Sequence, residues 1–300
     1  MDSSSPPHHH SNQNKTKIIV TMGATGCGKS RLSVDLATHF PHSQIINSDK
    51  MQLYNGLDIT TNKIPPHERK GFRSAAGLTI ANIVSRGNLP LLVGGSNSFI
   101  HALLVETFDP QVDVFTGPDS VSHLLRYDCC FLWVDVAWSV LSDYLCERVD
   151  EMLESGMLEE LAQFYEPTKV GVLVGLRKAI GVSEFDEYFR KYPPWESEAN
   201  GRIPKEGCDQ ARKEAYEEAV RLIKDNTCIL AKRQIGKILR LRKAGWDLKR
   251  LDATATFRAM MMKKKKNKSS SAASSDLEWR DIWEREVMEP SVKAVRRFLQ

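Results

Sequence analysis

The sequence lacks the features that mark membrane-spanning and secreted proteins. No apolar run approaches the roughly 18 residues that a membrane helix needs, and the longest is the strand-sized segment 129–134. The six cysteines include no C-x-x-C pair, which favours reduced thiols over a disulfide framework or a zinc site. The first sixteen residues contain no arginine and no apolar stretch, so they show neither a signal peptide nor a transit peptide. We therefore expect no membrane association.

Most of the chain also lacks an excess of positive charge. The net charge is +4, and Lys263 to Lys266 together with Lys268 supply more than this excess. The remainder is close to neutral, which argues against a general surface for nucleic acids. The hydrophobic fraction of 41% and the charged fraction of 27% are ordinary for a globular protein.

Strand patterns alternate with helix patterns in the first half of the chain. Buried strands are expected at 17–22, 44–47, 89–93 and 129–134. The segments 29–40, 72–86 and 97–105 between them have helical spacing. This alternation predicts an α/β fold, a parallel sheet with helices on both faces.

The second half of the chain has mainly helical patterns. Helices are expected at 138–154, 157–165, 184–192, 209–244 and 279–299, the last interrupted by Pro290. We predict one domain over 17–300, with a sheet core at about 17–136 and a helical part at about 137–300. Residues 1–16 are expected to be a disordered tail, and the Lys/Ser-rich stretch 263–275 a flexible loop.

One segment matches the phosphate-binding loop G-x-x-x-x-G-K-[ST]. It follows a predicted strand and opens a predicted helix, which is the context that this P-loop requires. Its residues are Gly23, Ala24, Thr25, Gly26, Cys27, Gly28, Lys29 and Ser30. Backbone N–H groups then face an anion, Lys29 supplies positive charge, and the Ser30 hydroxyl can hold Mg²⁺. The sheet is therefore expected to be P-loop NTPase-like.

A P-loop leaves three classes of protein open: a switch or motor NTPase, a kinase, and a transferase that binds another pyrophosphate. A GTPase switch needs D-x-x-G and N-K-x-D elements, but no Asp precedes a Gly by three places and Asn62-Lys63-Ile64 ends in Pro65. A small-molecule kinase needs an acid for Mg²⁺ at a strand end, which Asp135 can provide. The spacing also differs from the G-x-G-x-x-G of dinucleotide folds.

The segment 46–54 favours the transferase. It reads Ile-Asn-Ser-Asp-Lys-Met-Gln-Leu-Tyr and puts Asp49 at the C-terminal end of the second predicted strand. A parallel sheet opens its ligand crevice at this end of its strands. Asp49 is therefore expected to lie beside the P-loop.

With these two motifs the chain resembles the isopentenyltransferase family, whose members share a G-x-T-x-x-G-K-[ST] loop and a following S-D-x-x-Q-x-Y element. Further matching segments follow in the family's order at 92–103, 148–153, 175–181, 226–228 and 231–234. The resemblance covers roughly 17–251 and, more loosely, the C-terminal helix. It implies a single prenyltransferase domain that moves a dimethylallyl group from dimethylallyl diphosphate to the N6 amine of adenine and releases pyrophosphate.

The resemblance also implies roles for individual residues. Asp49 is similar to the family's general base, and Lys29 with Mg²⁺ on Ser30 would neutralise the leaving diphosphate. Thr25 resembles the residue that stabilises charge near the bridging oxygen, and Arg148 the arginine that grips the pyrophosphate. Further implied binding residues for diphosphate or nucleotide are Ser48, Gln52, Gly95, Ser96, Arg177, Lys178 and Lys232.

Each role has a structural alternative. Asp49 can cap a following helix, and Thr25 can merely shape the loop. Arg148 lies near three acids on a predicted helix, where a surface ion pair is easily made. Lys178 and Lys232 can simply be solvated.

The acceptor implied by the resemblance is a free adenine nucleotide, ATP, ADP or AMP, rather than tRNA. The tRNA enzymes of the family insert a helical domain before the arginine helix, and the short interval 109–128 has no room for it. The 92–103 segment resembles plant-type adenylate enzymes, which favour ADP and ATP and catalyse the first step of cytokinin biosynthesis. We expect a monomer, in the plastid by resemblance or otherwise in the cytoplasm; a tRNA acceptor and then a P-loop kinase are the alternatives.

The chain departs from the family pattern after Gly71. Relatives continue there with a Val-Pro-His-His-Leu segment and further residues before the helix that starts near Phe72. Either the protein itself lacks these residues, or it contains a segment between the two positions that the numbering leaves out. We predict that Gly71 and Phe72 are not covalent neighbours in the molecule.

Overall fold

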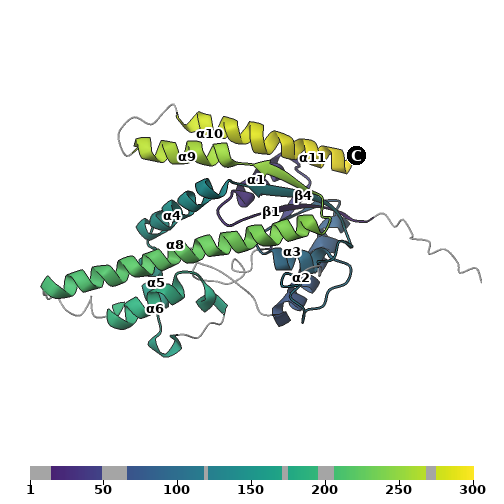
Figure 1. The fold of residues 1–300 in the computed structure, drawn as a ribbon. Coiled ribbons are helices and arrows are strands. Elements are labelled where there is room, and N and C mark those ends of the chain that lie inside the picture. The colour runs from purple at the N-terminus through teal and green to yellow at the C-terminus, as the bar shows by residue number, and fades with distance from the viewer. Residues whose placement is uncertain (1–14, 49–65, 118–120, 171–174, 195–205, 268–274) are drawn as a thin grey trace, which may run out of the picture.

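The computed structural model describes residues 15–48, 66–117, 121–170, 175–194, 206–267 and 275–300 (Figure 1). Its strands are β1 (Lys17–Gly23), β2 (Ser43–Asn47), β3 (Leu89–Val93), β4 (Asp128–Asp135) and β5 (Leu248–Asp252). Its α-helices in the first half are α1 (Lys29–His39), α2 (Pro66–Ser85), α3 (Asn97–Leu104), α4 (Trp138–Glu154) and α5 (Met157–Phe164). Those in the second half are α6 (Val182–Lys191), α8 (Glu206–Lys243), α9 (Thr254–Asn267), α10 (Ser275–Trp283) and α11 (Glu289–Leu299). Within the described ranges, no helix is long and apolar enough to cross a lipid bilayer.

The five strands form one parallel sheet in the order β2-β3-β1-β4-β5. The parallel α/β fold predicted from the alternating pattern is confirmed. β1 lies in the middle, so the loop that leaves its C-terminal end opens between β3 and β4. That is the position where an open parallel sheet binds ligands.

Alternate residues of the central strands fill two different cores. Ile18, Val20 and Met22 of β1 pack with α2, α3 and the C-terminal end of α8, whereas Ile19 packs with α1, α9 and α11. Successive side chains of a strand point to opposite faces, so an uninterrupted apolar run indicates a sheet covered on both sides. All four of these side chains are at most 1% exposed.

A third apolar cluster lies outside the sheet, among α4, α5, α6 and the N-terminal half of α8 (Figure 1). Its centre is Phe185, which is 0% exposed and packs near the rings of Tyr188 and Phe189. The 38-residue α8 joins this cluster to the sheet, because its later residues Ile238 and Leu241 belong to a sheet core.

Two elements differ from the sequence-based expectation. β5 was missed, because Leu248-Lys249-Arg250-Leu251-Asp252 has two consecutive exposed cations and becomes a strand only by pairing with β4. The predicted flexible loop at 263–275 is wrong for 263–267, which continue α9. Lysine is a good helix former, so a lysine run extends a helix that has already begun.

The C-terminal helix α11 packs against β4 and β5 of the sheet. The predicted interruption at Pro290 is wrong, because α10 passes through a π-helical turn at Glu284–Met288 into α11. Pro290 lies at the start of α11, where its missing N–H costs little. Trp283 reaches α1 and donates its indole N–H to Asp35 Oδ2 at 2.9 Å.

The prediction about Gly71 and Phe72 is also wrong. The two residues are consecutive within α2, which is a continuous helix from Pro66 to Ser85. A glycine inside a helix costs about 1 kcal/mol relative to alanine, which a 20-residue helix tolerates. The departure from the family pattern is therefore a shorter chain at this point.

His101 of α3 is a buried histidine without a polar partner in the described part of the chain. Its ring is stacked 6.1 Å from Trp246 and lies edge-on at 5.8 Å from Phe115, measured between centroids. Neither ring nitrogen has a hydrogen-bond partner among the described residues. Burial, and then the charge of Arg73, lower the pKa of His101 to about 4.

We expect stability to fall in mild acid because of this histidine. The folded-state pKa lies below the unfolded value of about 6.5, so the unfolded chain binds more protons as the pH drops from 6.5 towards 4. The free energy of unfolding should be about 2 kcal/mol lower at pH 5 than at pH 7.5, measured by urea denaturation. His101→Phe should remove this part of the pH dependence, while His123→Gln, on an exposed side chain, should keep it. An unchanged pH profile in His101→Phe would contradict the assignment.

Candidate functional site

The predicted P-loop joins β1 to α1 in the structure. Gly26 and Gly28 have φ angles of 75° and 93°, left-handed values that glycine adopts without a Cβ penalty. No side chain caps the start of α1 in the described part of the chain. The first N–H groups of the helix are therefore left for an anion, as a phosphate cradle requires.

Three loop side chains have distinct surroundings. Lys29 donates from Nζ to the Ala24 carbonyl at 2.6 Å, so its cation bends back over the loop. Ser30 is exposed at the first turn of α1, where its hydroxyl is accessible to a cation. The Cys27 thiol is buried in a sheet core, and burial raises its pKa, so this residue serves the loop through its backbone.

Helix α4 brings Arg148 to the P-loop. A Cβ placed on Gly26 would lie 3.8 Å from Arg148 Nη1 and 2.7 Å from Leu145 Cδ2, so α4 lies directly against the loop. The neighbouring acids of α4 have partners on other helices: Asp150 pairs with Lys224 at 2.6 Å, and Glu151 pairs with Lys264. The surface ion pair that offered a structural alternative for Arg148 is not found among the described residues.

The ends of β2 and β3 meet beside the P-loop. The backbone N–H and the hydroxyl of Ser48 both donate to the Val93 carbonyl, at 2.7 and 3.1 Å. A Cβ on Gly94 would lie 2.0 Å from Ser48 Oγ, and one on Gly95 would lie 3.6 Å from Lys29 Nζ. The close approach of Ser48 requires glycine at position 94, whereas a Cβ at Gly95 would meet only the ends of the Gln234 and Lys29 side chains.

Ser96 has a structural role here, because its carbonyl accepts the N–H groups of Phe99 and Ile100 at the start of α3. Asp49 and Gln52 lie outside the described residues, so their placement stays a prediction. Ser48, the residue before Asp49, is 1% exposed at the end of β2 that faces the P-loop.

Gln234 was not predicted as a site residue. It lies on α8, and its Oε1 accepts the Thr25 N–H at 2.6 Å. Its backbone carbonyl accepts from Asn97 Nδ2 at 3.0 Å, and its Nε2 lies 2.7 Å from the position of a Cβ on Gly95. One side chain thus connects the P-loop, the turn after β3 and α8. The matching segment 231–234 was the available signal, although nothing in it indicates which partner Gln234 contacts.

Two predicted binding residues have other contacts. Arg177 is 8% exposed; it donates to Glu166 Oε2 at 3.0 Å and stacks 5.1 Å from the ring of Phe164. Lys232 is exposed on α8, with Nζ 4.7 Å from the ring centroid of Trp138. Lys178 is half-buried in a short 3₁₀ turn next to Arg177. The described contacts of Arg177 belong to the outer helical cluster.

The acid that a kinase would need is already paired. Asp135, at the end of β4, accepts from Arg250 Nε at 2.7 Å, and its side chain is 15% exposed. This pairing raises the pKa of Arg250 and outweighs burial, which lowers it. A carboxylate held by a guanidinium is a poorer ligand for Mg²⁺ than a free one.

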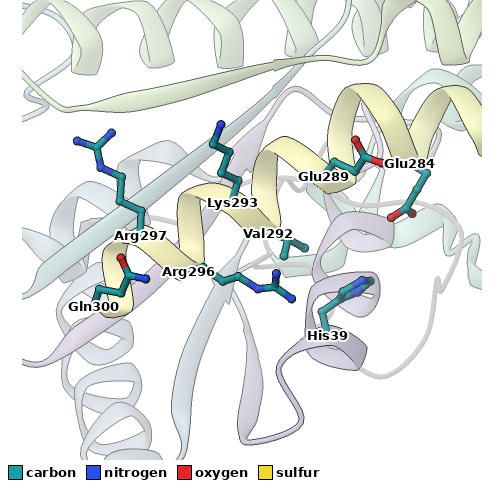
Figure 2. Close-up of a pocket in the computed structure, with 8 residues that line it drawn as sticks. All are labelled: His39, Glu284, Glu289, Val292, Lys293, Arg296, Arg297 and Gln300. Atoms are coloured by element: carbon teal, nitrogen blue, oxygen red, sulfur yellow. The ribbon is translucent and has the colours of Figure 1, made fainter.

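Two cavities lie along α11, away from the P-loop. The first, of about 530 Å³, is shown in Figure 2; Arg296 extends on the side of His39, whereas Lys293 and Arg297 point away from it. His39 is at the far end of the 11-residue α1, roughly 16 Å along the helix from the P-loop. The second cavity, of about 560 Å³, lies between α11 and the first residues of β4 and β5. Their distance from the cradle excludes both as the phosphate site.

A glycine-rich loop between a parallel strand and a helix, with a lysine over the loop and an arginine beside it, defines a P-loop phosphate-binding protein. Comparison with known proteins narrows this class. The sequence profile of the IPP transferase family matches residues 110–237. An adenylate isopentenyltransferase from Humulus lupulus is 55% identical, over 93% of this chain and 89% of that protein. The chain belongs to the adenylate isopentenyltransferase family, whose members are prenyltransferases.

Other relatives agree with this membership. Adenylate isopentenyltransferase 1 from Arabidopsis thaliana, named chloroplastic, is 50% identical over 96% of this chain and 83% of that protein. Another Arabidopsis relative, 40% identical, is named mitochondrial. A solved tRNA isopentenylpyrophosphate transferase from Bacillus halodurans shares the fold, with a TM-score of 0.60 and 19% identity over 95% of this chain and 100% of that one.

The alignment with the Humulus relative runs over 307 residues, more than the 300 of this chain. That relative therefore has residues for which this chain has no counterpart. This agrees with a chain shortened within the family.

Proposed function

We propose that this chain transfers a dimethylallyl group from dimethylallyl diphosphate to the N6 amine of ATP, ADP or AMP, releasing pyrophosphate as the first step of cytokinin biosynthesis. The observation that carries the proposal is the combination of a P-loop flanked by Arg148 with 55% identity to a protein named adenylate isopentenyltransferase. The diphosphate would lie in the cradle at the start of α1, and the adenine on the side of Asp49.

The chain's own residues supply positioning and charge. Lys29 would turn from the Ala24 carbonyl to the leaving diphosphate, and Arg148 would contact the same group from α4. Thr25 would stabilise charge near the bridging oxygen through its hydroxyl, because Gln234 Oε1 accepts its backbone N–H and fixes this part of the loop. Asp49 would accept the N6 proton as the nitrogen bonds to carbon and becomes acidic. Catalysis then rests on orientation and electrostatic stabilisation of the departing group.

Mg²⁺ fits the residues present. The exposed Ser30 hydroxyl stands at the first turn of α1, the position at which P-loops offer a hydroxyl to the ion. When bound, the ion would help to neutralise the diphosphate.

Free nucleotides are favoured over tRNA as acceptors. The relatives that match most of this chain are named adenylate enzymes. The interval 109–128 contains only a loop with an isolated bridge from Val105 to Leu125 in its described part. We propose residence in the plastid, supported by relatives named chloroplastic, and action as a monomer.

Incubation of the purified chain with labelled dimethylallyl diphosphate and ATP, ADP, AMP or tRNA tests the proposal. We expect N6-prenylated nucleotide with release of pyrophosphate, and no label in tRNA. ATP should keep its three phosphates in the prenylated product. Formation of ADP in step with a phosphorylated acceptor, without prenylation, would instead identify a kinase.

Gln234→Ala should raise the KM for dimethylallyl diphosphate about fivefold with little change in kcat. The variant loses one hydrogen bond that orients the Thr25 N–H, worth about 1 kcal/mol. Gln234 contacts the loop and no reacting atom, so the effect should appear in donor binding. Gln210→Ala, an exposed change of the same kind on α8, should leave both constants unaltered. A fall in kcat at constant KM would show that Gln234 acts otherwise.

A further inference from the structure

Helices α4 and α8 lie side by side and run in opposite directions (Figure 1). On α4, Trp138, Cys146 and Asp150 are separated by multiples of four residues. Residues spaced by four form one ridge on a helix. On α8, Lys224, Cys228 and Lys232 form a second ridge in the same way.

One contact on each side of the two cysteines, along the helices, sets the register in which the two ridges pack. Lys224 Nζ lies 2.6 Å from Asp150 Oδ1, and Lys232 Nζ lies 4.7 Å from the ring of Trp138. Cys146 lies one turn from Asp150, and Cys228 one turn from Lys224, so this register brings the two thiols face to face. Besides burial, the neighbouring Cys146 thiol contributes to a raised pKa of Cys228, which agrees with this register, and both residues are partly exposed.

The remaining described cysteines are poorer candidates for oxidation. Cys27 and Cys130 are buried in a sheet core. Burial raises the pKa of the Cys129 thiol and raises that of Cys130 to about 11. Thiols held protonated in apolar surroundings react slowly.

The two cysteines lie on α4 and α8, two of the helices that touch the P-loop. Arg148, two residues after Cys146, lies against Gly26, and Gln234, six residues after Cys228, holds the Thr25 N–H. We propose that Cys146 and Cys228 form a dithiol–disulfide pair whose oxidation weakens diphosphate binding at the P-loop. The effect on diphosphate rests on the proposed function, whereas formation of the bond does not.

The chemistry needs a small-molecule disulfide such as oxidised glutathione. One cysteine thiolate attacks the glutathione disulfide, forms a mixed disulfide and releases one glutathione; the second thiolate then displaces the other. The protein gives up two electrons and two protons, and the oxidant leaves as two thiols. Burial, and then Cys146, raise the pKa of Cys228, so cross-linking should be faster at pH 9 than at pH 7.

Bond formation changes the distance between the helices. The sulfur atoms must approach to about 2.05 Å, well inside the separation of two packed thiols. This draws α4 towards α8 and shifts Arg148 relative to the loop. A displacement of about 1 Å among the residues that bind the diphosphate is expected to lower the affinity for it.

The test compares reduced and glutathione-oxidised full-length chain. We expect peptide mapping by mass spectrometry to find a Cys146–Cys228 cross-link, and titration calorimetry to show about tenfold weaker binding of inorganic pyrophosphate, reversed by dithiothreitol. Cys146→Ser and Cys228→Ser should lose both responses, whereas Cys129→Ser should keep them. The cross-link closes a loop of about 80 residues and should raise the melting temperature by about 5 °C.

If the peptide map found only mixed glutathione adducts, or a cross-link to another cysteine, the assignment of Cys146 and Cys228 as a pair would be overturned. A Cys146–Cys228 bond that leaves pyrophosphate affinity unchanged would overturn its effect on the P-loop. Failure of the reduced protein to prenylate nucleotides would count against the proposed function instead, because the peptide map and the pyrophosphate titration require no turnover.

Discussion

Asp49→Ala should lower the rate of prenyl transfer by about 10²- to 10⁴-fold, the loss typical for a general base that is removed. Asp49 follows Ser48 at the end of β2, and the backbone of Ser48 is bonded to β3 beside the P-loop. The N6 amine becomes acidic only as it bonds to the allylic carbon, so a carboxylate is needed at that moment. Single-turnover rates with dimethylallyl diphosphate and ATP measure the loss.

Two further variants sharpen this test. Asp49→Asn keeps the shape of the side chain and removes the base, so it should be about as slow as Asp49→Ala. Asp143→Ala, an exposed carboxylate on α4, should leave the rate unchanged. A thermal melt should show a fold like that of the parent chain for all three. Near-parental turnover in Asp49→Asn would eliminate Asp49 as the base.

Gly23→Ala should destabilise the protein by about 3 kcal/mol or more. A Cβ at this position would lie 2.5 Å from the Val134 carbonyl oxygen and 2.4 Å from Cys27 Sγ. Val134 is paired with Gly23 in the β1–β4 ladder, so its carbonyl can move only if the centre of the sheet moves. Overpacking typically costs about 1–3 kcal/mol, and here it meets rigid backbone. Urea denaturation measures the change.

The same chemical change at Gly236 is a matched control. Gly236 lies within α8, and a Cβ added there would have no neighbouring atom within 4 Å, so alanine meets only open space. Gly236→Ala should stabilise the helix by up to about 1 kcal/mol. If both substitutions changed the free energy of unfolding equally, the contact with Val134 would not be the cause of the destabilisation at Gly23.

Much of the fold could be predicted from the sequence because its determinants are local. The continuous apolar run Ile18-Ile19-Val20 indicates a strand covered on both faces, and both faces are covered. The strand β5 could not be predicted, because Lys249 and Arg250 interrupt its pattern and its stability comes from pairing with β4. The helical extension over 263–267 could not be predicted either. The composition indicated a loop, but the preceding helix α9 continues through these residues.

For the candidate site, some of the predicted residues lie at the P-loop and others do not. Arg148 was expected from a matched segment and lies at the loop, whereas Arg177 was expected on the same ground and is paired with Glu166. A matched segment identifies a residue type at a position in the chain. It does not say which way that side chain points after the helices pack.

The sequence by itself determined the phosphate cradle, because all eight residues from Gly23 to Ser30 are contiguous and the backbone supplies most of the anion's ligands. Only the tertiary structure decided which distant side chains complete it. Gln234 meets Thr25 across 209 residues of sequence, and Cys146 faces Cys228 because α4 and α8 pack in one register. Such contacts depend on the packing of whole helix faces, which apolar clusters far from the loop control.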